Sequence, residues 1–94
     1  MASLRGIKND IDYLVSEVIS DCYMALYFND QSKREGIVAV IEEAVDFRNE
    51  MIQRANHPAD KQNKSLVKEH YAQMRRDMMT RIDALFGKLS DICK

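Results

Sequence analysis

Apolar residues recur at helical spacing along three long stretches of the chain. Projected at 100° per residue, those of the middle stretch occupy about half of a helix circumference. A helix with so broad an apolar face needs neighbours on two sides, so the pattern predicts a central helix packed against two others. Its apolar positions are Ile37, Val40, Ile41, Ala44, Val45, Phe47, Met51, Ile52 and Ala55.

The flanking stretches each carry an apolar stripe that predicts one further helix. We expect helices at residues 3–28, 33–56 and 64–92, forming a single domain over residues 1–94. Because the connecting loops are short, consecutive helices must run antiparallel. The predicted fold is therefore all-α, an antiparallel up-down-up three-helix bundle. The two stripes are Leu4, Ile7, Ile11, Leu14, Val15, Val18, Ile19, Cys22, Ala25 and Leu26, and Val67, Tyr71, Met74, Met78, Ile82, Leu85, Leu89 and Ile92.

Polar residues near the predicted helix ends supply capping signals. Ser3 is expected to cap the first helix, and Asp60 or Asn63 the third. The segment Ser32 to Glu35 matches a capping box, which predicts that the Ser32 hydroxyl caps the second helix. Pro58 disfavours a helical residue before it and marks the end of that helix.

Charge and composition exclude several kinds of protein. With three Gly, one Pro and 31% charged residues, the chain lacks the turn residues of an all-β fold. The net charge of −1 predicts no strong attraction to nucleic acid or to an anionic membrane. Residues 1–60 carry a net −5 and residues 61–94 a net +4, which favours packing of the third helix against the first two.

Localisation is also indicated by what the pattern lacks. The chain opens without the apolar core of a signal peptide, and its uncharged runs are far shorter than a membrane span. Cys22 and Cys93 have no metal-ligand spacing, so we expect free thiols in a reducing compartment. These features predict a cytoplasmic protein that associates with no membrane.

Arg48 is the one charged residue placed near the centre of the middle helix's apolar face. We expect it to be partly buried and paired with a carboxylate at its own level, either Asp10, Asp12, Glu17 or Glu69. Such a pair predicts that Arg48→Ala lowers the free energy of unfolding by a few kcal/mol.

A second hypothesis makes Arg48 the anchor of a polar pocket with Tyr71 and His70. The protein would then be a binder of a small anionic ligand, or a small helical enzyme. Neither a metal site nor a cofactor is expected, because the two histidines lack ligand spacing and the acidic side chains of the middle helix point to solvent. These acidic residues are Glu42, Glu43, Asp46 and Glu50.

Several large apolar residues lie outside the main stripes and should be exposed in a lone three-helix bundle. An exposed apolar patch usually marks an interface, so we expect self-association, most simply into a two-fold homodimer within a larger helical assembly. Another protein's helix is the other candidate partner. The function favoured by the sequence is thus a non-catalytic protein-interaction or structural module, ahead of the anionic-ligand binder and of nucleic-acid binding. The candidate interface residues are Tyr13, Met24, Tyr27, Phe28, Met79 and Phe86.

Overall fold

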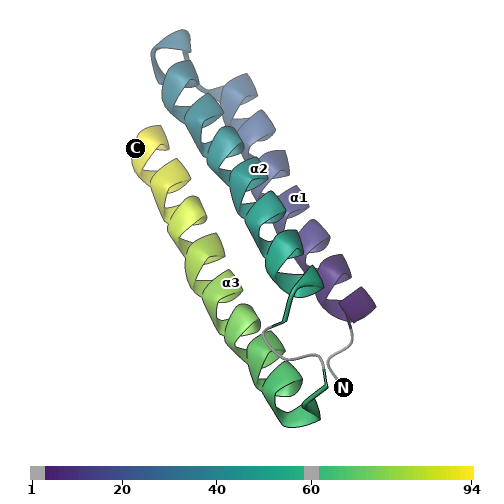
Figure 1. Ribbon diagram of the computed structural model, residues 1–94. Helices are drawn as coiled ribbons and strands as arrows, with labels where there is room; N and C mark the ends of the chain where they lie inside the picture. Colours follow the sequence, from purple (N-terminus) through teal and green to yellow (C-terminus); the bar gives the residue numbers. More distant parts are fainter. Residues whose placement is uncertain (1–3, 59–61) are drawn as a thin grey trace.

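The computed structural model describes residues 4–58 and 62–94 of the chain. Three α-helices pack against one another: α1 (Leu4–Phe28), α2 (Arg34–Asn56) and α3 (Lys64–Cys93), with a short 3₁₀ turn, η1 (Gln31–Lys33), before α2 (Figure 1). The described residues contain no strand, so the all-α prediction is confirmed. The three helices begin and end within one residue of the expected ranges.

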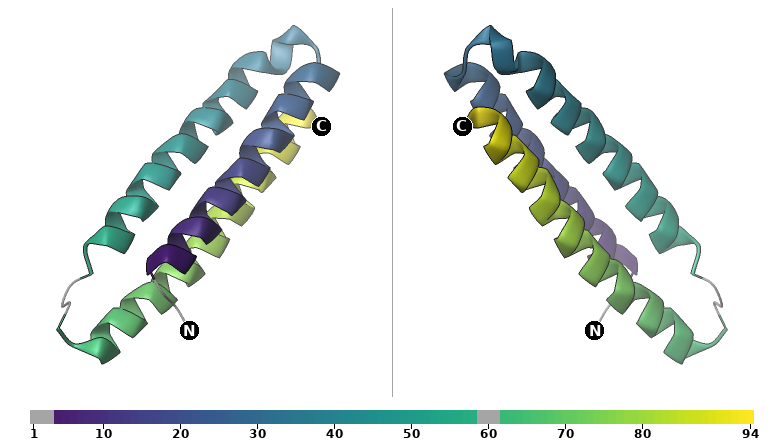
Figure 2. Two further views of the ribbon diagram at one scale, coloured as in Figure 1. Left: turned by 90° about the vertical axis from the view of Figure 1, so that its right-hand side faces the viewer. Right: turned by 90° about the vertical axis from the view of Figure 1, so that its left-hand side faces the viewer.

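The helices lie side by side along the length of an elongated molecule, whose principal extents are 52, 19 and 18 Å. Figures 1 and 2 show α1 and α3 running in the same direction and α2 running against both. Side-chain contacts agree: Glu43 of α2 bonds Lys88 of α3, and Arg54 of α2 bonds Asp77, so residue numbers rise along α2 as they fall along α3. α1 packs more extensively on α2 than on α3, which leaves the seam between α1 and α3 the more open one.

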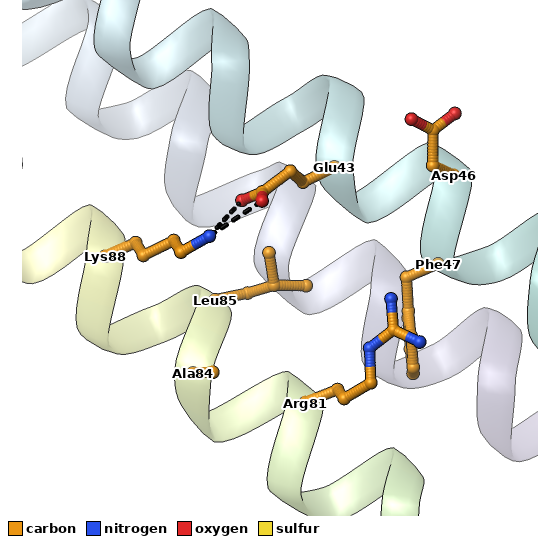
Figure 3. Close-up of a pocket in the computed structure, with 7 residues that line it drawn as sticks. All are labelled: Glu43, Asp46, Phe47, Arg81, Ala84, Leu85 and Lys88. Atoms are coloured by element: carbon orange, nitrogen blue, oxygen red, sulfur yellow. Dashed lines mark hydrogen bonds and ion pairs between the residues drawn. The ribbon is translucent and has the colours of Figure 1, made fainter.

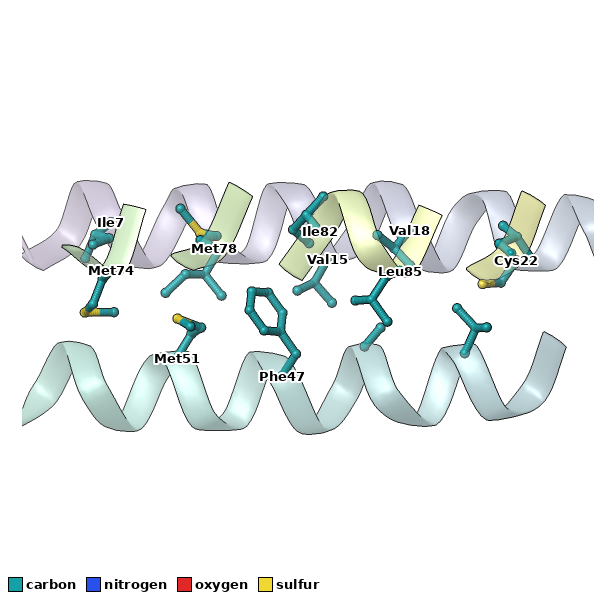
Figure 4. Packing of buried hydrophobic residues seen from close by; sticks show 14 of the residues in the cluster. Ile7, Val15, Val18, Cys22, Phe47, Met51, Met74, Met78, Ile82 and Leu85 are labelled. Atoms are coloured by element: carbon teal, nitrogen blue, oxygen red, sulfur yellow. The ribbon is translucent and has the colours of Figure 1, made fainter. Parts of the chain in front are cut away.

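A single hydrophobic core runs along the axis of the molecule, with residues from all three helices (Figure 4). Phe47 is 1% exposed and projects from α2 between side chains of α1 and α3. The expected apolar face of α2 is too broad, however, because Val45 is 41% exposed. The buried positions of α2 are Ile37, Val40, Ala44, Phe47, Met51 and Ala55.

The start of α2 differs from the expected capping box. Ser32 does not cap α2: its backbone amide and its hydroxyl both donate to the carboxylate of Asp30, the amide at 2.9 Å. This bonding builds the 3₁₀ turn, so that α2 begins at Arg34 and its N-cap position falls on Lys33, which makes no side-chain capping bond. The prediction was wrong because the Asp30 carboxylate, two residues earlier, is a charged acceptor that binds both the amide and the hydroxyl of Ser32. Those two hydrogen bonds also lower the pKa of Asp30.

The start of α3 agrees with the sequence. Asn63 Oδ1 accepts hydrogen bonds from the backbone amides of Ser65 at 3.0 Å and Leu66 at 3.2 Å. These bonds satisfy two of the amides that lack a partner in the first helical turn. The expected caps Ser3 and Asp60 lie outside the described residues.

Opposite charges on α3 and its neighbours pair as the uneven charge distribution predicts. Each of these pairs is about half exposed, so each contributes at most about 1 kcal/mol. Their effect is to orient α3 between the other two helices. The basic residues Arg75, Arg81 and Lys88 of α3 bond Asp10, Glu50 and Glu43, respectively.

Candidate functional site

Arg48 lies at the edge of the buried face of α2, and its side chain is 44% exposed. Its Nε donates to Asp12 Oδ1 of α1 at 2.8 Å, so Asp12 is its partner among the four carboxylates considered. The expected position of Arg48 near the centre of the buried face was wrong. The buried stripe of α2 follows Phe47, and the next residue is turned by 100° toward the rim.

Tyr71 and His70 instead lie against the C-terminal end of α2 and bond its last carbonyl groups. The Tyr71 hydroxyl donates to the carbonyl oxygen of Ala55 at 3.1 Å, and His70 Nε2 lies 2.7 Å from the carbonyl oxygen of Arg54. The backbone amide of His57 donates to the same Arg54 carbonyl at 3.3 Å. The last carbonyls of a helix have no partner within it, and α3 supplies two of these partners, Tyr71 and His70.

The three residues of the expected anionic pocket therefore hold different partners. Arg48 reaches across to α1, whereas Tyr71 and His70 reach from α3 to the end of α2. Tyr71 is 7% exposed and its hydroxyl is already bonded, which leaves it poorly placed to meet a ligand. Nothing in this arrangement directs the three groups toward one shared anion.

A shallow hollow of about 290 Å³ lies between α2 and α3 (Figure 3). Its apolar wall is formed by Phe47 and Leu85. Lys88 Nζ bonds both oxygens of Glu43, at 2.7 and 3.0 Å. The guanidinium carbon of Arg81 lies 4.8 Å from the centre of the Phe47 ring, a cation–π contact.

Both cations of this hollow already have carboxylate partners, since Arg81 also bonds Glu50. Figure 3 shows the Asp46 carboxylate pointing away from Arg81 and Lys88. The hollow is therefore a groove between two helices that ion pairs bridge. Its two cationic side chains are already bonded to carboxylates and are poorly available to an anionic ligand.

The described residues hold no group of three or more His, Cys, Asp and Glu side chains placed to bind a metal ion. Cys22 is buried and Cys93 half-buried, and both are free thiols. Burial raises the pKa of the Cys22 thiol, and the nearby Asp21 and Cys93 raise it further. A thiol held protonated in this way is a poor nucleophile.

Most of the large apolar side chains with high exposed fractions belong to the expected interface. Phe86 differs from the rest because it is partly buried and packs against the core. Tyr23, which is 62% exposed, was missed, although it falls in the run from Cys22 to Phe28 that is apolar on every side. The exposed fractions are 66% for Tyr13, 57% for Met24, 83% for Tyr27, 74% for Phe28 and 49% for Met79.

Two further findings bear on the class of protein. Across the described parts of the chain, no helix has the length and apolar character needed to cross a membrane. No family model, curated protein or solved structure matches the sequence.

Proposed function

We propose that this protein is a non-catalytic helical bundle, of the antiparallel up-down-up type, that works as a protein-interaction module through self-association. The observation that carries the proposal is the apolar C-terminal end of α1. Tyr23, Met24, Tyr27 and Phe28 are each more than half exposed within less than two helical turns. Such a patch on a small protein usually marks an interface.

Covering these side chains would stabilise an assembly appreciably. Burial of one large apolar side chain contributes about 1.5–3 kcal/mol, and aromatic residues dominate the energetics of interfaces. Tyr27 and Phe28 already contact each other edge to face, with ring centres 5.0 Å apart. They present a pair of rings whose outer surfaces have no cover within the described chain.

The partner that we propose is a second copy of the chain. Small homo-oligomers most often form two-fold dimers, in which the same patch serves both subunits. Two free cysteines are consistent with a reducing compartment, and we place the protein in the cytoplasm.

Sedimentation equilibrium at micromolar concentration tests this proposal. We expect a mass near twice that of the 10.9 kDa chain. Met24→Ser should shift the mass toward that of the single chain because it removes an exposed apolar side chain of this patch. Val45→Ser, at an exposed position of α2, is the matched control and should leave the mass unchanged. A single-chain mass for the unmodified protein at every concentration would refute self-association.

A further inference from the structure

Two contacts define how α3 is rotated against α1. Arg75 of α3 bonds Asp10 of α1, and Asn29 Nδ2, just after α1, lies 3.6 Å from Cys93 Sγ. Residue numbers rise together along the two helices, and a residue of α1 lies level with the α3 residue about 65 positions later. Arg75 and Cys93 are 18 residues apart, which is five full turns, so they lie on one side of α3. That side faces α1.

The side of α3 that faces α2 is defined in the same way, by Arg81 and Lys88, which bond residues of α2. The remaining side faces neither helix. Arg76, Met79 and Asp83 lie on this third side within about 60° of one another, and all three are exposed. We call these three residues the α3 outer face.

The α3 outer face has an ordered charge pattern. Arg76 and Asp83 are seven residues apart, about 10.5 Å along the helix, with Met79 between them. Arg76 bonds Gln73, one turn away on its own helix, at 2.7 Å. Asp83 forms no ion pair with any residue in the described parts of the chain. Its carboxylate is therefore available to a partner. The Asp10–Arg75 register places the exposed Glu17 of α1 level with residue 82 of α3, which adds negative charge at this end.

This pattern is complementary to itself when the helix direction is reversed. A two-fold axis crossing α3 between residues 79 and 80 places Arg76 of each copy opposite Asp83 of the other. Met79 of the two copies then meets at the axis. The same axis places Ala72 opposite Gly87. Gly87 has no side chain and the space beside it is open in the single chain, so the two backbones could approach closely there.

We propose that the α3 outer face is the contact between two copies of this chain, with the two α3 helices antiparallel and Arg76 paired with Asp83 in both directions. The inference rests on the self-association proposed above and specifies its geometry. Tyr13 and Met24 of α1 extend the contact, since both are exposed and lie within about 60° of Asp10, which faces α3.

The order of charges favours a second copy over a basic amphipathic helix. A basic helix would satisfy Asp83 and Glu17 but would place like charges against Arg76. A second copy brings opposite charges together at both ends and buries Met79 against itself. Charge order of this kind determines partner choice and register in paired helices.

A charge-swap experiment with sedimentation velocity tests the proposed contact. Arg76→Glu and Asp83→Arg should each weaken the dimer at least tenfold, because each places two like-charged pairs across the axis. An equimolar mixture of the two variants should restore the dimer, since the mixed pair is complementary at both ends. The double variant should also dimerise. Arg34→Glu, an exposed charge reversal on α2, is the control and should leave the dissociation constant unchanged.

The outcomes separate this inference from the proposed function. If the unmodified chain dimerises but the single reversals have no effect, self-association stands and the α3 outer face is not its interface. If both single variants weaken the dimer and their mixture does not restore it, the Arg76 and Asp83 pairing is refuted. An unmodified chain that stays monomeric overturns both proposals. Binding of a basic amphipathic peptide to such a monomer would identify the alternative occupant. Circular dichroism confirms that each variant is folded.

Discussion

Replacing Arg48 by alanine tests most directly whether the charge of Arg48 is exposed to solvent or buried in the bundle. The Arg48 side chain is 44% exposed, and that of its partner Asp12 is 52% exposed. Exposed ion pairs contribute about 0.2–1 kcal/mol, because water screens them and both side chains lose freedom. Alanine also has a slightly higher helix propensity than arginine, which offsets part of that loss. We therefore expect Arg48→Ala to lower the free energy of unfolding by no more than about 1 kcal/mol.

The measurement is a urea titration followed by circular dichroism, at a concentration where the chain is monomeric. Arg48→Ala, Asp12→Ala and the double variant form a cycle whose coupling energy should fall between about 0.2 and 1 kcal/mol. Phe47→Ala, one residue away and fully buried, is the contrasting control and should cost about 3–5 kcal/mol. A loss of several kcal/mol for Arg48→Ala would show that its charge is buried and would refute the argument.

Three further predictions follow from individual contacts. Tyr71→Phe should lower the free energy of unfolding by about 1–2 kcal/mol, because a buried carbonyl at the end of α2 loses its donor; Tyr13→Phe, at an exposed site, should be silent in the same urea titration. Gly87→Ala should raise the free energy of unfolding of the monomer by up to about 1 kcal/mol, and its melting temperature with it, since the added methyl group meets no neighbour and improves helix propensity; a lower melting temperature would contradict this. Iodoacetamide at neutral pH should modify Cys93 well before Cys22, as peptide mass mapping would show, because Cys22 is buried and its thiol pKa is raised; equal rates would contradict the burial.

The helix ends show where sequence reasoning holds and where it fails. Asn63, one of the two residues expected to cap α3, does cap it, since its side chain bonds amides only two and three residues ahead. Ser32 was misassigned because two overlapping local motifs compete for its amide, and the one built on Asp30 forms in the structure. Local patterns identify the candidates, but the relative strength of neighbouring acceptors decides between them.

The candidate site could be predicted only in part. Exposure of Tyr13, Met24, Tyr27 and Phe28 followed from their position outside the apolar stripe of α1, and the structure agrees. Phe86 has a similar position in the pattern of α3 and yet packs against the core. Whether a residue at the border of a stripe is covered depends on the rotation of the neighbouring helix, which periodicity does not specify.

The sequence by itself determined the number of helices, their limits and the residues at the centre of each buried stripe. The reason is that helical periodicity and capping are local properties that act over a few residues. Only the tertiary structure decided the residues at the stripe edges and the long-range contacts. It places Arg48 at the rim beside Asp12, and it brings Tyr71 and His70 to the last carbonyls of α2. These contacts join residues at least 16 positions apart, so they depend on how the helices rotate and slide against one another as the core packs.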